Sequence, residues 1–182
     1  MSLSDIKKQC ENCTKCVLSQ TRTNIVFGDG NENAKLMFVG EAPGKNEDLQ
    51  GIPFVGAAGK LLNKYLDAVG IPRDAVYIAN ILKCRPPQNR DPLPEEEDAC
   101  IPYLDAQIDA IKPAMIICLG RIAAKRLIKS DFAITKERGQ WFERNGYRIM
   151  AIYHPAALIY DNNKKEVTYD DFKMLKAEYD KL

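Results

Sequence analysis

The sequence predicts a single α/β domain over residues 1–182, with a central, mainly parallel four-stranded sheet flanked by helices in three layers. Short apolar runs alternate along the chain with segments of helical periodicity, as they do where parallel strands are joined by crossover helices. No internal repeat and no low-complexity linker divides the chain. A hydrophobic content of 46% and a charged content of 28% are typical of a folded globular domain.

Four apolar runs predict the strands. Each is short and rich in apolar side chains, as buried strands are. The runs are KLMFVG (35–40), VYIAN (76–80), AMIICLG (114–120) and YRIMAIYH (147–154).

Four segments with helical spacing predict the helices: 57–69, 95–112, 121–128 and 168–182. The first stops at Gly70, a residue that suits the left-handed end of a helix. Pro102 predicts a break or restart inside the second, because proline removes a helical hydrogen bond. Thr168 is the expected N-cap of the last. The segment 85–94 contains four prolines and predicts a stiff loop.

The net charge and the N-terminal sequence limit the classes of protein to which the chain can belong. A formal net charge of +1 gives no overall basic excess, so nucleic-acid binding would depend on a local patch. The N-terminal residues MSLSDIKKQ are polar and lack the apolar region of a signal peptide. No apolar run approaches the length of a membrane span. We therefore expect a cytoplasmic protein without membrane contact, whose thiols stay reduced.

Three cysteines lie within CENCTKC, residues 10–16, and form two overlapping C-x-x-C pairs. One such pair, together with Cys84 and Cys100 on either side of the proline loop, would supply four thiolates. Zinc and an iron–sulfur cluster both accept four thiolates, and spacing alone leaves the two open, along with unliganded thiols. Cys118 lies inside an apolar strand and is expected to be a buried, inert thiol.

Polar and glycine-rich residues follow three of the four predicted strands. The turn GEAPG (40–44) follows the first strand, Asn80 ends the second, and His154 with Pro155 ends the fourth. Ligands of parallel sheets bind outside the carboxyl ends of the strands, so these residues are expected to converge on one site.

The chain closely resembles the iron–sulfur "family 4" uracil-DNA glycosylases. The resemblance covers nearly the whole chain, and GEAPG, PFVG, N-x-x-x-C-R-P-P and HPA are highly specific as a combination. The matching segments are CTKC (13–16), TRT (21–23), VFGDGN (26–31), GEAPGKNED (40–48), GIPFVGAAGKLLN (51–63), YIANILKCRPPQNRDPLPEE (77–96) and HPAAL (154–158).

This resemblance implies a uracil-DNA glycosylase-like fold and a DNA-repair hydrolase that flips uracil out of DNA and leaves an abasic site. It also implies a structural [4Fe–4S] cluster, held by Cys13, Cys16, Cys84 and Cys100, that braces the N-terminus. Cys10 falls outside the family pattern. The chemistry is expected to need no divalent metal. The expected partner is uracil-containing DNA, single- or double-stranded, bound by a monomer.

The resemblance assigns three roles in the base pocket. Phe54 matches the aromatic residue that stacks on the flipped base. Asn80 matches the residue that reads the edge of uracil, because its amide accepts from N3–H and donates to O4. His154 matches the histidine beside uracil O2, where a neutral N–H would stabilise the charge of the departing base.

The carboxylates have less definite roles. Glu47 matches a position near the C5 edge of uracil, where it would obstruct the methyl group of thymine, align water or counter the charge of the sugar. Asp48 is the alternative acid. Glu41 belongs to the turn whose backbone, with Gly40 and Ala42, is expected to contact the base. GEAPG lacks the aspartate that activates water in the better-known uracil glycosylases, so the general base stays open.

Basic residues beside the proline loop and in TKERG are the candidates for contacts with the DNA backbone: Lys83, Arg85, Arg90, Lys136 and Arg138. One departure from the family affects DNA binding. Tyr160 stands where arginine is usual, so strand binding is expected to be weaker or to depend on Lys164 or Lys165.

Two other functions are alternatives to uracil excision. The same scaffold acting on another deaminated base, such as hypoxanthine, is disfavoured by Asn80 and Glu47. A non-catalytic, metal-stabilised nucleic-acid-binding module is disfavoured by Asn80 and His154, which simple duplex binding would not need.

Overall fold

The computed structural model describes residues 1–182 and contains the four predicted strands as the centre of its sheet. They are β2 (Leu36–Gly40), β3 (Tyr77–Asn80), β4 (Met115–Leu119) and β6 (Tyr147–Ile152). These strands pair in parallel in the order β3-β2-β4-β6, which confirms the parallel core.

Two short strands at the edges extend the sheet from the predicted four strands to six. β1 (Asp29–Gly30) pairs antiparallel with β3, and β5 (Phe142–Arg144) pairs antiparallel with β6. Neither carries an apolar run, so hydrophobic patterning could not find them. The turn between β5 and β6 is Asn145-Gly146, with φ of 47° and 87°, a dipeptide that favours two-residue hairpins.

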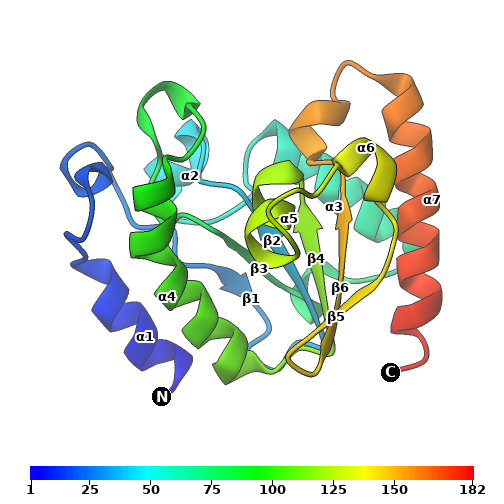
Figure 1. Cartoon of the computed structure of the whole chain (residues 1–182), viewed down its shortest axis with the longest axis horizontal. Helices are drawn as coiled ribbons and strands as arrows, with labels where there is room; N and C mark the ends of the chain where they lie inside the picture. Colours follow the sequence, from blue (N-terminus) through cyan, green and yellow to red (C-terminus); the bar gives the residue numbers. More distant parts are fainter.

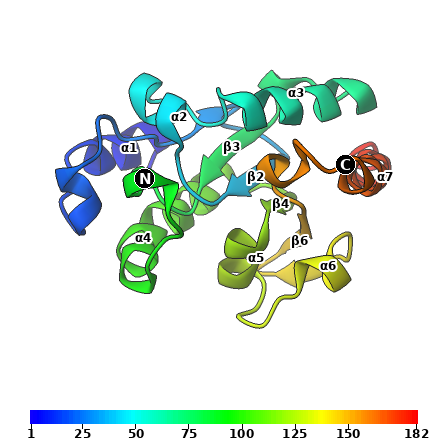
Figure 2. The ribbon, with the colours of Figure 1, turned by 90° about the horizontal axis from the view of Figure 1, so that it is seen from above.

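Helices cover both faces of the sheet (Figures 1 and 2). One face carries α1 (Leu3–Glu11), α4 (Pro94–Ile111), α5 (Arg121–Leu127) and α6 (Ile134–Glu137), and the other carries α3 (Ala57–Val69) and α7 (Asn162–Tyr179). The short helix α2 (Lys45–Gln50) follows β2. Four 3₁₀ segments are η1 (Val17–Gln20), η2 (Arg73–Ala75), η3 (Pro87–Asn89) and η4 (Pro155–Leu158).

The sheet divides the core into two apolar clusters. Met37 and Val39 of β2 belong to the cluster under α1, α4 and α5, whereas Leu36 and Phe38 belong to the cluster under α3 and α7. All five residues of β2 are buried. A strand buried on both faces needs a continuous apolar run, which explains why strand prediction was accurate here.

Two helices differ from their predicted forms. α4 continues through Pro102 without a break. Pro102 is exposed, as is Asp98 four residues earlier, so water can satisfy the carbonyl that loses its helical bond. α7 begins at Asn162, six residues before the predicted start, because the side chain of Asp161 caps it by accepting from the N–H of Lys164. Thr168 is therefore a buried residue inside the helix.

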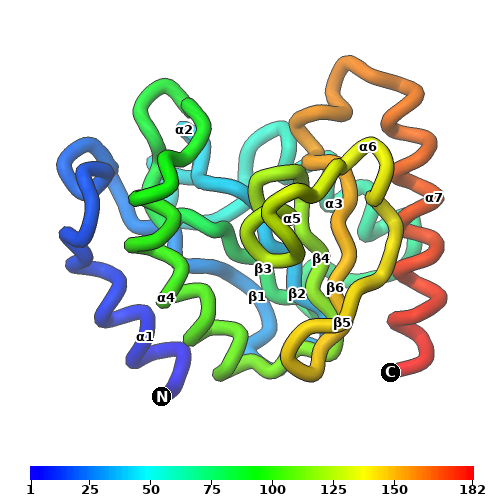
Figure 3. The backbone as a smooth tube through the Cα atoms, viewed as in Figure 1, coloured from blue at the N-terminus to red at the C-terminus, as the bar shows by residue number.

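The loops that follow the parallel strands lie together along one edge of the sheet (Figure 3). They comprise residues 41–56 after β2, 81–93 after β3 and 153–161 after β6. None of the helices has the length and apolar character that crossing a membrane requires.

Candidate active site

A cleft of about 580 Å³ opens at this edge of the sheet. It brings together residues from all three loops, as the positions of the strand ends predicted. Six of the predicted substrate-binding residues line it: Glu41, Ala42, Glu47, Phe54, Asn80 and His154. Gly40 lies beneath them, at the end of β2 and paired with Asn80 in the sheet.

Asn80 presents a buried amide at the floor of the cleft. Its side chain is 2% exposed, and its Oδ1 atom has no hydrogen-bond partner in the protein. A buried amide oxygen without a partner costs about 1–3 kcal/mol, so such atoms mark ligand sites or bound water. A Cβ atom at Gly40 would lie 2.5 Å from this oxygen and 2.7 Å from Cζ of Phe54. Glycine at position 40 therefore leaves the room in which a planar ligand can reach Asn80.

Substitution of Gly40 by alanine should lower the uracil excision that the sequence resemblance implies at least tenfold, because the new methyl group displaces both Asn80 and Phe54. The rate constant with saturating enzyme measures the effect, and thermal unfolding measures any general damage. A variant that excises at the wild-type rate would show that Asn80 and Phe54 can accommodate the methyl group without loss of activity.

His154 has a defined tautomer. Its Nδ1 atom accepts the backbone N–H of Ala156 at 3.0 Å, so the ring proton of the neutral imidazole is on Nε2. Burial lowers the pKa of His154 from 6.5 to about 4, while the negative charge of Glu47 acts in the opposite direction. Near pH 7 the residue is thus a neutral N–H donor that lines the cleft.

Phe54 adopts a backbone conformation that aromatic residues rarely take, with φ of 54°. Arg73 holds the turn around it: Nη2 donates to the carbonyl of Pro53 at 3.0 Å, and Nη1 donates to that of Phe54 at 3.4 Å and to Asn63 Oδ1 at 2.7 Å. The ring centroids of Phe54 and His154 are 5.6 Å apart. The turn thereby presents the phenyl ring to the cleft beside the histidine.

Glu47 binds three backbone N–H groups. Oε1 accepts from Gly44 at 3.1 Å, and Oε2 accepts from Val55 at 2.9 Å and from Gly56 at 2.7 Å. The carboxylate thus joins the turn after β2 to the turn that carries Phe54. Its negative charge stays at the cleft wall, but both oxygens are already engaged as acceptors, which leaves Glu47 poorly available as a base.

The two other acids have different surroundings. Glu41 lines the cleft, and burial followed by the nearby charge of Asp91 raises its pKa. Asp48 is buried, and its Oδ1 atom accepts from the N–H groups of Thr23 and Asn24. The idea of Asp48 as the alternative acid is therefore wrong, because this carboxylate fastens residues 23–24 to α2 and does not line the cleft.

The prediction for Lys83 is also wrong. This lysine was predicted to contact the DNA backbone, but its side chain is fully buried. Its ammonium donates to the carbonyl of Asn80 and to Gln107 Oε1, at 3.0 and 2.6 Å. Burial lowers its pKa to about 8. Sequence reasoning missed this because lysine side chains are almost never fully buried.

The other predicted basic residues lie at or near the surface. Arg90 lines the cleft and forms a two-pronged ion pair with Glu96. Arg138 pairs with Asp171 at 2.8 Å. Arg85 donates from Nε to Asn89 Oδ1, and Lys136 is exposed. Of these four residues, only Arg90 lines the cleft.

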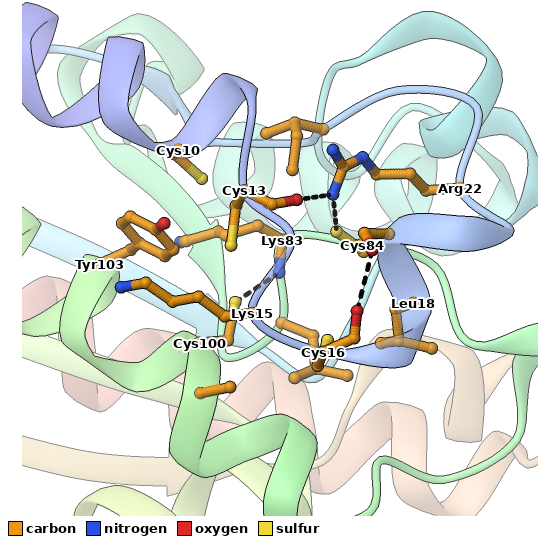
Figure 4. A pocket seen from close by; sticks show the side chains of 14 residues that line it. Cys10, Cys13, Lys15, Cys16, Leu18, Arg22, Lys83, Cys84, Cys100 and Tyr103 are labelled. Atoms are coloured by element: carbon orange, nitrogen blue, oxygen red, sulfur yellow. Dashed lines mark hydrogen bonds between the residues drawn. The ribbon is translucent and has the colours of Figure 1, made fainter.

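A separate pocket, between α1, the segment 12–22 and α4, gathers five of the six cysteines (Figure 4). Cys13, Cys16, Cys84 and Cys100 line it together with Cys10. All are free thiols. Cys118 lies apart, fully buried in β4, as predicted.

The surroundings of these thiols are cationic. Lys15, Arg22 and Lys83 line the pocket, and no carboxylate does. Arg22 donates to Cys84 Sγ at 3.5 Å, and the backbone N–H of Lys83 donates to Cys100 Sγ at 3.2 Å. These donors fit a group that carries several thiolates. No three Cys, His, Asp or Glu side chains are arranged to hold a single metal ion.

The fold and the cleft define an α/β protein of the uracil-DNA glycosylase class: residues 27–176 match the model of the uracil DNA glycosylase superfamily. Within that superfamily, the chain belongs to the type-4 uracil-DNA glycosylases.

Three relatives bearing the type-4 name illustrate the similarity. The protein of Archaeoglobus fulgidus is 49% identical over 96% of this chain and 92% of its own length. That of Sulfurisphaera tokodaii is 47% identical over 96% of this chain and 84% of its own length. That of Thermotoga maritima is 40% identical over 94% and 92%. The resemblance found in the sequence motifs is thereby confirmed.

Proposed function

We infer that the protein removes uracil from DNA by hydrolysing the bond between uracil N1 and the sugar, which leaves an abasic site. The observation that carries this inference is the buried, unpartnered Oδ1 atom of Asn80 at the floor of a cleft lined by Phe54 and His154. A base in duplex DNA cannot reach such a floor. The nucleotide must therefore flip out of the stack, at a cost of a few kcal/mol.

Asn80 is suited to recognise uracil. Its Oδ1 atom accepts from uracil N3–H, and its Nδ2 group donates to O4. Cytosine carries the opposite pattern, so it would leave buried polar groups unpaired. Phe54 stacks on the base in this arrangement, and Glu47 lies at the wall where the methyl group of thymine would extend.

His154 supports departure of the base. As the N1–C1′ bond breaks, its electron pair moves to uracil and is shared with O2. The Nε2–H of neutral His154 donates to that oxygen, and the donation strengthens as negative charge develops. Water then bonds to C1′ of the cationic sugar and releases a proton to the solvent, and the departed uracil anion takes up a proton in its turn. The carboxylate of Glu47 favours the positive sugar electrostatically, so little assistance from a general base is needed.

The pH profile tests the state of His154. Because burial lowers its pKa to about 4, the neutral donor is complete at pH 6 and is lost only as the pH falls toward 4. Single-turnover excision should be flat across the ordinary histidine pKa of 6.5. The lowered pKa also makes the folded state less stable as the pH falls from 6.5 to 4, because the unfolded chain takes up the proton first. An inflection in rate near 6.5 would contradict this role.

We propose that Cys13, Cys16, Cys84 and Cys100 hold a [4Fe–4S] cluster. The cationic lining of their pocket supports it, because four thiolates make such a centre anionic. Bound there, the cluster would supply structure by joining the N-terminal segment to the proline loop and α4. These four cysteines do not line the base cleft, so the cluster would take no part in excision.

DNA binding is proposed to depend on cations around the cleft, with Arg90 at its wall. The protein is proposed to act as a monomer on single-stranded or double-stranded DNA. Tyr160 belongs to this surface. It is 99% exposed and adjoins Ile159, which lines the cleft.

Tyr160→Arg should tighten binding to uracil-containing DNA and steepen its salt dependence. One added phosphate contact increases the slope of log K against log salt by about 0.7 to 0.9. Fluorescence anisotropy at several salt concentrations measures both effects. Tyr169→Arg on α7, away from the cleft lining, is the matched control. Equal slopes for the two variants would mean that position 160 does not meet the DNA backbone.

The activity itself has a direct test. The purified protein is incubated with a labelled oligonucleotide that contains one uracil, in EDTA, and alkali then cleaves any abasic site. Cleavage at the uracil position alone is expected. Intact strands would overturn the proposed function, and cleavage at hypoxanthine in place of uracil would change the substrate.

A further inference from the structure

Lys83 is a buried cation to which the steps of excision assign no role. It is fully buried and forms no ion pair with a carboxylate. A buried charge is costly unless hydrogen bonds compensate it. Its position therefore requires an explanation.

The ammonium bridges the active site to α4. It donates to the backbone carbonyl of Asn80 at 3.0 Å and to Gln107 Oε1 at 2.6 Å. Gln107 has one orientation only, because its Nε2 group donates to the carbonyl of Phe27 at 2.9 Å, an atom that can only accept. The same Nε2 group donates to the hydroxyl of Tyr77 at 3.1 Å. Lys83 thus bonds to acceptors that are themselves fixed.

The backbone of Lys83 is held as firmly as its side chain. Its N–H donates to Cys100 Sγ at 3.2 Å, and its carbonyl accepts from Val26 at 2.8 Å. Lys83 and the next residue, Cys84, both line the cysteine pocket (Figure 4). One residue therefore touches the strand end that carries Asn80 and the site that carries the thiols.

We propose that Lys83 is a positioning residue for uracil excision: it fixes the carbonyl of Asn80, and thereby the direction of the Asn80 amide, against a framework anchored at the cysteine site. The proposal rests on the proposed function. Asn80 is the last residue of β3, and two bonds hold the peptide that follows it: the N–H of Ile81 donates to the carbonyl of Gly40 at 2.9 Å, and Lys83 donates to the carbonyl of Asn80. Without the lysine only the bond to Gly40 would hold this strand end, and a shift of the strand end would displace the amide from the base.

A double-mutant cycle separates this role from general stabilisation. Lys83→Met keeps the length and packing of the side chain and removes the donor. In the wild-type background it should lower the single-turnover rate at least tenfold. In the Asn80→Ala background it should change the rate less than twofold, because the residue on which Lys83 acts is gone. Equal effects in both backgrounds, or no effect in either, would overturn the proposal.

Two further measurements keep the outcome interpretable. Binding of an oligonucleotide with 2′-fluoro-deoxyuridine, which resists excision, should weaken in Lys83→Met only when Asn80 is present. This readout tests Lys83 even if wild-type protein fails to excise uracil, a result that would count against the proposed function alone. The visible absorbance of the cluster, measured in the same samples, should stay at the wild-type level. Absorbance that falls in proportion to the rate would overturn the proposal by placing the effect in the cluster.

Gln107→Met provides a second variant should Lys83→Met fail to fold. It keeps the lysine and removes the amide that steadies its ammonium. The expected loss of rate is smaller, and it should again vanish in the Asn80→Ala background. A loss that persists without Asn80 would refute positioning through this residue.

Discussion

Replacing Asn80 by alanine should lower the rate of uracil excision by about 100- to 1,000-fold while the protein keeps its fold. The amide is the only side chain at the cleft floor with an unpartnered buried acceptor, and it sits where the sheet ends. Its loss removes both hydrogen bonds that read the base. The side chain supports no other element, because its Oδ1 atom bonds to nothing in the protein. Single-turnover kinetics measure the rate, and circular dichroism checks the fold.

Asn80→Asp sharpens this test. The substitution keeps the size of the side chain but replaces the Nδ2 donor by a second acceptor, which would face uracil O4. We expect a loss at least as large as that of alanine, because two acceptors now oppose each other in a buried site. Asn33→Ala, at an exposed asparagine in the turn after β1, is the control and should behave like wild type. Excision by Asn80→Asp at the wild-type rate would refute base reading through this amide.

The location of the cleft could be predicted from the sequence because three polar or glycine-rich stretches each follow a buried strand. Parallel strands bring such ends to one edge, whatever the details of the helices. Gly40, Asn80 and His154 were found in this way. Phe54 and Glu47 do not follow a strand directly, and only the resemblance to a family drew attention to them.

The hydrogen-bond partners of the charged side chains could not be predicted from the sequence. Asp48 and Glu47 are neighbours in KNED, yet one is buried against residues 23–24 and the other lines the cleft. Lys83 had the residue type of a phosphate contact, but the fold places it in the interior. Such outcomes depend on partners distant in sequence, such as Gln107, that no local pattern specifies.

The strands at the sheet edges were missed for a different physical reason. β1 and β5 consist of two and three residues and lie where one side of the strand has no neighbour. Edge strands this short need no apolar run, since little of their surface is buried. The Asn145-Gly146 turn was the one available signal for β5.

The cysteine site carries the other large expected effect, which depends on the choice between Cys10 and Cys13. Both thiols line the same pocket, but Cys10 is fully buried in the apolar cluster under α1, whereas Cys13 is partly exposed. Cys13→Ser should abolish the visible absorbance of the cluster and reduce the iron content. It should also lower the midpoint of thermal unfolding strongly, because the segment 12–22 contains no α-helix and the proposed cluster would join it to α4.

Cys10→Ser should keep the absorbance and the iron, since this residue lies outside the four-cysteine pattern. Its expected cost is about 1–3 kcal/mol, from placing a hydroxyl among apolar side chains, and Cys10→Ala should recover part of that cost. Iron analysis and absorbance of the three variants, purified without oxygen, separate the two roles. Loss of iron in Cys10→Ser together with its retention in Cys13→Ser would reverse the assignment. The ligand pair would then be Cys10 with Cys16, and the segment would enter the pocket one turn of α1 earlier.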